Sequence, residues 1–308
     1  MDVSNADQVA FRNNVELQLQ QGANMALMEA VVWESQTGAE KIKVKDIFEA
    51  KRAKSASERN GRTVWDDPTN DGVWLAKPDE LYEAFLIENA DQLKTTISLG
   101  GAATMITAQT LNRARIQRVL EGFYAPIISG KQGTTSTAFP AAAEIAATVG
   151  GAAGAQPMNT KKLRQAKLYL REGFVDPTAQ AYMVLTAEDN DALLDEVPAT
   201  STDFQRAFGA KVDEAGNLIA MLGFKFIHLE LDDPNLDTIP ALATDGSGYR
   251  RNPFWVKGGL VGNYWQQLRS KVGEVAELRF NQGTLGGTTL AATRTQAGRC
   301  GTVKCLKA

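Results

Sequence analysis

The chain has 308 residues, with 33 Lys and Arg against 36 Asp and Glu, which gives a formal net charge of −3. This length corresponds to about two ordinary domains or one large elaborated domain, and 44% hydrophobic residues are enough for a real core. The charge balance argues against a dedicated nucleic-acid binder, which would carry a strongly basic domain. A single histidine, His228, excludes most His-dependent metal sites and the commonest general base.

The cysteines and the termini indicate a soluble protein made in a reducing compartment. Cys300 and Cys305 are too few for the disulfide framework of a small secreted fold. On a strand their odd spacing would place them on opposite faces about 16 Å apart, too far for a disulfide, so we expect free thiols. The N-terminus lacks the basic and apolar segments of a signal peptide, and the weakly polar run 141–155 contains Glu144. We therefore expect no membrane partner.

The first third of the chain is predicted to be extended. Residues 1–22 are polar and precede the first apolar cluster at 25–33, which is typical of an arm that leads into a short helix. Residues 41–45 alternate with period two, and turn-forming residues occupy 66–72. We predict a two-stranded projection with a charged tip over about 39–80.

Such a projection has no core of its own, because an isolated hairpin is marginally stable in water. One interpretation is a mobile surface loop. The hypothesis we favour is an arm that docks on a neighbouring subunit, with Trp65 and Trp74 as anchors. The basic residues of the same stretch include Arg52, Arg59 and Arg62.

The next stretch, 79–124, is the best helical segment. Asp79 can open a helix, and apolar residues at 116, 119, 120 and 123 follow helical spacing, so we predict a long helix over about 102–123. Arg113 lies at the edge of this face and Arg118 points away from it. Arg113, Arg115 and Arg118 could contact polyanions, but a solvated face or salt bridges between subunits are the favoured interpretations.

The remainder alternates helices and strands without a repeated βα unit, which predicts the α+β class. Residues 129–158 are rich in Gly, Ala, Thr and Ser and are predicted to form a loop or insertion. We expect a helix at 160–171 capped by Gly173, a buried strand at 181–185, and a helix that starts at the Thr186–Asp189 capping box. Strands are predicted at 224–228 and through 254–308, with a helix-capable piece at 264–271.

No catalytic or cofactor motif is present in the sequence. The loop 125–132 lacks the first glycine and the hydroxyl of a phosphate-binding loop. The adjacent carboxylates at 66–67 and 232–233 are interpreted as solvated turn residues. His228 is interpreted as a packed core or surface residue, because it shares a predicted strand face with Phe224 and Phe226. We expect no cofactor, no metal and no enzymatic activity; a soluble α+β hydrolase that works through carboxylates is the alternative.

Three stretches carry a family resemblance: 163–194, in which a helix feeds a strand and then a second helix; the strand 223–227; and the return through 255–279. In this order, behind a polar arm, a charged hairpin and a long helix, the chain resembles the major capsid proteins of tailed bacteriophages, the Johnson fold of the Hong Kong phage type. The resemblance spans nearly the whole chain. It implies an N-terminal arm (1–38), an extended loop (39–83), a peripheral domain with the spine helix (84–135), an axial domain (136–253) and returning peripheral strands (254–308).

The resemblance further implies a major capsid protein that assembles through hexamers and pentamers into an icosahedral shell around double-stranded DNA. Its expected partners are other copies of itself, portal, scaffolding and decoration proteins, and DNA held by non-specific contacts. The expected location is the virion capsid, assembled in the host cytoplasm. An encapsulin-like compartment is the alternative within the shell class. The predicted subunit-interface residues are Arg52, Arg59, Arg62, Trp65, Trp74, Arg113 and Arg118.

Overall fold

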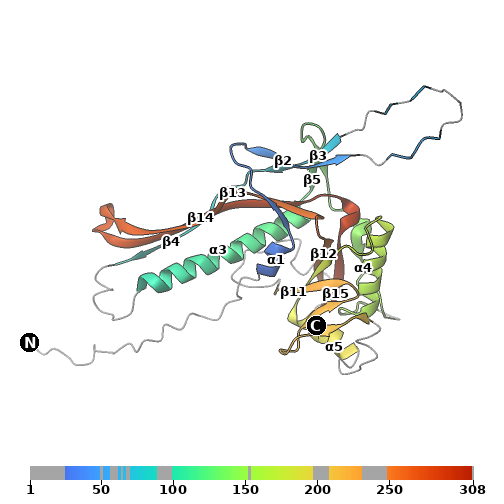
Figure 1. Cartoon of the computed structure of the whole chain (residues 1–308). Coiled ribbons are helices and arrows are strands. Elements are labelled where there is room, and N and C mark those ends of the chain that lie inside the picture. Colours follow the sequence, from blue (N-terminus) through green and yellow to red (C-terminus); the bar gives the residue numbers. More distant parts are fainter. Residues whose placement is uncertain are drawn as a thin grey trace, which may run out of the picture.

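A computed structural model describes residues 25–48, 51–55, 62–63, 65–66, 70–88, 99–151, 154–196, 208–230 and 248–306. These residues form three sheets. A long ribbon of strands with a helix beside it extends from one end of a packed α+β unit, and a hairpin projects near the junction (Figure 1). The predicted α+β class is confirmed.

The packed unit is built on a seven-stranded sheet with the order β7-β15-β12-β8-β11-β10-β9. Its strands are β7 (Glu144–Ile145), β8 (Ala181–Leu185), β9 (Lys211–Val212), β10 (Leu218–Met221), β11 (Phe224–His228), β12 (Tyr249–Val256) and β15 (Cys300–Leu306). Both faces of the sheet are covered, and every residue of β8 is therefore buried.

Two hydrophobic cores lie against the two faces of this sheet. On one face, α4 (Thr160–Glu172) and α5 (Ala187–Glu196) pack on Met183 and Leu185 of β8. On the other face, Trp255 has no exposed surface and packs with Tyr182 and Phe123. The second core also includes α1 (Met25–Glu29). Alternate residues of one strand thus belong to different cores, because side chains alternate across a sheet.

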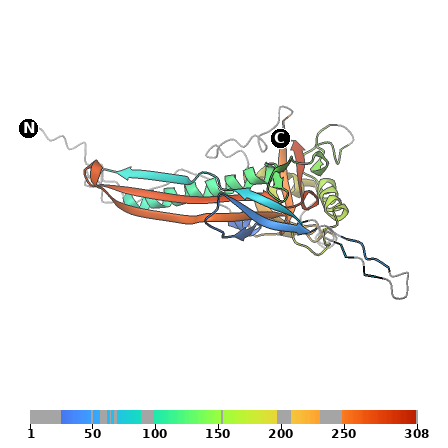
Figure 2. The ribbon, with the colours of Figure 1, turned by 90° about the horizontal axis from the view of Figure 1, so that it is seen from above.

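The long ribbon is a four-stranded sheet of order β1-β13-β14-β4, formed by β1 (Val32–Glu34), β13 (Leu260–Val275), β14 (Asn281–Arg294) and β4 (Leu81–Ile87). The helix α3 (Leu99–Tyr124) runs along it, as Figure 2 shows from above. Gly122 and Gly286 permit this close approach: a Cβ on Gly122 would lie 2.0 Å from the carbonyl oxygen of Ala292, and one on Gly286 would lie 2.6 Å from Leu111 Cδ1.

The projecting hairpin belongs to a third sheet, of order β2-β3-β5-β6: β2 (Lys41–Phe48), β3 (Asn70–Ala76), β5 (Ile127–Ser129) and β6 (Thr135–Thr137). The predicted two-stranded projection is confirmed by the antiparallel pairing of β2 with β3. At its base, Val44 and Leu75 pack against Val261 and Ala291 of the long ribbon. The hairpin base therefore has a small core, which the sequence did not predict.

Several predicted helices and strands are confirmed. The long helix α3 contains the predicted 102–123, and its apolar face with Val119 and Phe123 is buried. Asn159 caps the start of α4 and Gly173 its end, and Thr186 Oγ1 donates to Asp189 Oδ2 at 2.7 Å at the start of α5. Gly173 is needed for space rather than for a positive φ, since a Cβ there would lie 2.6 Å from the carbonyl oxygen of Gly298.

Two helical expectations are wrong. Asp79 does not open a helix: the following residues form β4, which pairs antiparallel with β14. The helix-capable piece 264–271 lies inside β13 and also pairs with β14. In both places ladder hydrogen bonds to a distant strand override a weak local preference.

The stretch 129–158 is more ordered than the predicted loop. It contains β6, a short 3₁₀ helix at Ala141–Ala143, and β7, which pairs parallel with β15. Further short 3₁₀ turns lie at Ala276–Leu278 and Ala297–Arg299. The predicted returning strands of 254–308 are divided between two sheets, since β13 and β14 join the long ribbon whereas β15 joins the seven-stranded sheet. The domain boundaries given above stay a prediction.

Candidate interaction surfaces

The described residues of the distal part of the extended loop belong to no hydrophobic core. Arg52 and Arg62 are exposed, and Trp65 is 88% exposed, which is unusual for the largest apolar side chain. Lys54 Nζ lies 2.7 Å from Asp66 Oδ1, and the hydrogen bond from this lysine lowers the pKa of the Asp66 carboxyl. Arg59 lies outside the described residues.

Trp74 differs from Trp65 because it contacts its own chain. Its Nε1 donates to the carbonyl oxygen of Gly130 at 2.7 Å, and the backbone of Gly133 lies against its ring. The half-buried ring thereby fixes the hairpin to the turn between β5 and β6. A role for Trp74 at a subunit interface stays a prediction.

The two predicted arginines of α3 also lie close to their own chain. Arg113 is 8% exposed, and its Nη2 donates to Thr110 Oγ1 at 3.3 Å. Arg118 Nε lies 3.7 Å from a carboxylate oxygen of Glu121, and its side chain is 27% exposed. Arg115, which was not selected from the sequence as an interface residue, donates to the Tyr264 hydroxyl at 2.9 Å and ties α3 to β13.

The face of the long ribbon that points away from α3 carries an exposed apolar strip, named here the outer sheet face. It is formed by Tyr82 (71% exposed), Leu86 and Leu285, which share one face because Leu285 pairs with residue 84. A groove of about 540 Å³ runs beside the strip where Gly287 has no side chain, between Glu80 and Arg269. Residues 82–86 read Tyr-Glu-Ala-Phe-Leu, so no polar and apolar alternation in the sequence signals this face.

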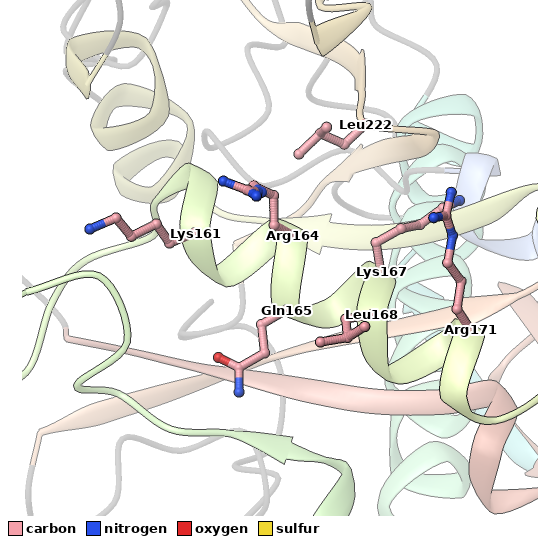
Figure 3. A pocket seen from close by; sticks show the side chains of 7 residues that line it. All are labelled: Lys161, Arg164, Gln165, Lys167, Leu168, Arg171 and Leu222. Carbon is pink, nitrogen blue, oxygen red and sulfur yellow. The ribbon is translucent and has the colours of Figure 1, made fainter.

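A second groove, of about 520 Å³, follows the outer side of α4 and is named here the α4 groove. Its lining residues are Lys161, Arg164, Gln165, Lys167, Leu168, Arg171 and Leu222. In Figure 3 the cationic ends of Arg164, Lys167 and Arg171 rise on the side of Leu222, whereas Gln165 points the opposite way. Burial lowers the pKa of Lys167, and the nearby Arg171 adds to this effect. The groove is therefore a concentration of positive charge.

The histidine and the two cysteines, which are the side chains that could take part in catalysis, lie in packed or hydrogen-bonded environments. His228 is half-buried, and its Nε2 lies 2.8 Å from the carbonyl oxygen of Leu218. Cys300 and Cys305 are buried free thiols, as predicted, and burial raises the pKa of Cys300 to about 12. Within the described ranges no group of His, Cys, Asp and Glu side chains could hold a metal ion. Asp67, Asp232 and Asp233 lie outside the described residues.

The helices of the described part of the chain do not combine the length and the apolar character that crossing a membrane requires.

Comparison with known proteins decides the family. The model of the family described as phage capsid protein matches residues 3–307. The chain belongs to the phage capsid protein family. A search of curated proteins found no match for this capsid protein.

Solved capsids share the fold at low sequence identity. The capsid of Ralstonia phage GP4 has a TM-score of 0.68 at 9% identity, covering 100% of this chain and 98% of that one. The capsid of cyanophage P-SCSP1u has a TM-score of 0.67 at 10% identity, covering 97% and 94%. The capsid of Helicobacter pylori bacteriophage KHP30 has a TM-score of 0.64 at 11% identity, covering 99% and 97%.

The family and the fold together confirm the central predictions. The capsid protein has the Johnson fold, and its function is that of a major capsid protein that forms an icosahedral shell. Its place is the virion capsid. The family match and the solved structures give no support to the encapsulin-like compartment or to the hydrolase.

Proposed function

We propose that this capsid protein assembles through hexamers and pentamers into a closed shell around double-stranded DNA, with the arm (1–38) and the extended loop (39–83) lying over neighbouring subunits. The observation that carries the proposal is the exposure of Trp65 on a projection whose distal part has no core among the described residues. A large aromatic side chain in that position gains the free energy of leaving water only when a partner buries it.

The near-neutral net charge of −3 fits a shell that a motor fills with DNA rather than one filled by charge attraction to DNA. We infer that the remaining contacts with the packaged DNA are non-specific. We further infer that portal, scaffolding and decoration proteins are the other partners, that assembly takes place in the host cytoplasm, and that the chain has no catalytic role. The interface residues are Arg52, Arg59, Arg62, Trp65, Trp74, Arg113 and Arg118, of which Arg52, Arg62 and Trp65 are the exposed members within the described residues.

The test is negative-stain electron microscopy with light scattering on the purified chain. Shells, tubes or rings of five or six subunits are the expected products. Trp65→Ala should leave the free energy of unfolding of the monomer within about 0.5 kcal/mol, because the side chain is exposed, while reducing the amount of assembled material. A wild-type chain that stays monomeric at high concentration, alone and with its scaffolding protein, would contradict the proposal.

A further inference from the structure

The two helices on the outer side of the seven-stranded sheet carry opposite charges at the same spacing. On α4 the cations are Arg164, Lys167 and Arg171, and on α5 the acids are Glu188, Asp191 and Asp195. Both sets follow the same steps of three and then four residues, which places each set on one helix face. With a rise of about 1.5 Å per residue, each set spans about 10.5 Å. The two rows of charge therefore match in length and in step.

Neither row is neutralised by the other within one subunit. Among the described residues no ion pair joins α4 to α5, and no ion pair involves Arg164 or Arg171. The hydrogen bonds between the two helices lie at their ends, where Glu196 Oε2 accepts from the backbone N–H of Thr160 at 2.6 Å and from its hydroxyl at 2.8 Å. Repulsion between neighbouring cations consequently persists in the isolated subunit, as Lys167 beside Arg171 illustrates.

The acidic row is accessible to a partner. Asp191 and Asp195 are exposed, and neither takes part in an ion pair within the described residues. Glu188 pairs with Arg250 but keeps 43% of its side chain exposed. The row is held in place because the opposite side of α5 is buried through Asp189, Asn190 and Leu193.

We propose that the α4 groove receives the acidic row of α5 from a second copy of this chain, and that this contact joins adjacent subunits of a ring. The inference rests on the proposed function, because it specifies one of the contacts through which the subunits assemble. The groove and the acidic row are two distinct patches of the subunit, and a ring joins them head to tail as a heterologous contact, which closes when the rotation between subunits permits. Each exposed ion pair is weak, but a row of pairs repeated around a ring adds up.

A second copy fits the groove better than a nucleic-acid backbone does. The chain itself supplies an acidic row of matching step, and its positive and negative charges nearly balance. The groove also contains Leu168, which is 54% exposed, together with Leu222. An apolar floor between cations is typical of a protein interface with a polar rim rather than of a phosphate track.

Paired charge reversals test this contact. One variant carries Arg164→Glu and Arg171→Glu, a second carries Asp191→Arg and Asp195→Arg, and a third carries all four changes. Lys211→Glu with Lys225→Glu is the matched control, because both lysines are exposed on the same sheet, on β9 and β11. Circular dichroism establishes that each variant is folded, and light scattering with electron microscopy over a concentration series records assembly.

Each of the first two variants should raise the protein concentration at which assembly begins by about tenfold or more, because like charges then face each other. The four-residue variant should return to within about threefold of the wild type, since the pairs are restored with inverted sign. The control should assemble like the wild type.

Three outcomes would overturn the inference. Assembly of the α4 variant at the wild-type concentration would show that the groove is not a subunit contact. Failure of the four-residue variant to recover would show that the two rows do not face each other. Unchanged assembly of the α4 variant with a loss of nuclease-protected DNA would identify a polyanion as the partner. If the wild type assembles neither alone nor with its scaffolding protein, the proposed function fails and the inference fails with it. If the wild type assembles and the charge-reversal variants assemble equally well, the inference fails alone.

Discussion

Lys162 is a buried lysine whose ammonium group connects two elements of the packed unit. Its side chain has no exposed surface, although its neighbours on α4, Lys161 and Arg164, are exposed. The ammonium group donates to the carbonyl oxygen of Gln156 at 2.6 Å and to that of Lys304 at 2.7 Å, so it joins α4 to β15. Burial lowers the pKa of Lys162, because removal from water disfavours the charged form.

Lys162→Met should lower the free energy of unfolding by about 1–3 kcal/mol at neutral pH, because the carbonyl groups of Gln156 and Lys304 each lose the hydrogen bond from the ammonium group. The pH dependence has a definite sign. The pKa of Lys162 is lower in the folded than in the unfolded chain, so the unfolded chain binds more protons in the interval between the two values. Wild-type stability therefore rises with pH in that interval, and the deficit of the variant grows.

Urea unfolding at neutral pH and at about pH 9.5 measures this difference. Lys161→Met is the control, because its exposed side chain should contribute little at either pH. A deficit that is constant or shrinks toward alkaline pH would contradict the assigned cause.

The hydrogen bonds around Asp189 were predicted only in part from the sequence. Thr186 and Asp189 stand three residues apart, and this spacing predicted the capping box that the structure contains. The same Asp189 carboxylate also accepts from Arg250 and from Asn252, which lie more than sixty residues further along the chain. No local pattern connects these residues, because the pairing of β12 with β8 is what brings them together.

At the scale of elements, the spacing of apolar residues predicted the helices and strands that bury one face. It did not predict the strands of the long ribbon. The helix α4 alternates buried and basic residues at helical spacing, and its predicted bounds differ by one residue from the observed ones. Residues 267–274 of β13 are all exposed. Neither face of this part of the strand is buried, so no alternation of polar and apolar residues marks it as a strand. Its strand conformation depends on the ladder to β14, which no local sequence encodes.

At the contact between α3 and β14, helix propensity and steric overpacking have opposite effects on the stability of a Gly122 variant. Gly122→Ala favours the helix by about 1 kcal/mol through propensity. The new Cβ would lie 2.0 Å from the carbonyl oxygen of Ala292, and backbone cannot yield as a side chain can. Overpacking costs about 1–3 kcal/mol and more where backbone must move, so the net effect should be a lower free energy of unfolding.

Thermal and urea unfolding of the monomer measure the effect of Gly122→Ala. Gly273→Ala is the control, because no atom lies within 4 Å of the position that its Cβ would take and its φ is not positive. A Gly122→Ala chain more stable than the wild type would show that the helix can move away from the strand at no cost.

At the scale of the whole molecule, the elongated shape leaves apolar surface that the chain does not cover. The long ribbon has α3 on one side (Figure 2). Among the described residues nothing covers the outer sheet face, where Tyr82, Leu86 and Leu285 are exposed. A shell subunit requires such surfaces, because its interfaces are completed only by other copies.

The double substitution Tyr82→Ser and Leu285→Ser should change the free energy of unfolding of the monomer by less than about 1 kcal/mol, since both side chains are largely exposed. Assembly should weaken, because the strip loses apolar area that contact with another copy would bury. Ser270→Ala, at an exposed position of β13 beside the same groove, is the control and should assemble normally. Normal assembly of the double variant would exclude the outer sheet face from the subunit contacts.

The α+β class, the helices α3, α4 and α5, the projecting hairpin, the free thiols and the resemblance to phage capsid proteins could all be predicted from the amino-acid sequence. These features depend on local spacing, capping and composition, which are visible along the chain. The two sides of the long ribbon, the enclosure of Lys162 and the burial of Arg113 became apparent only in the folded molecule. They depend on pairing between segments that lie far apart in sequence, such as β4 with β14, whose free energy comes from contacts that no single segment contains.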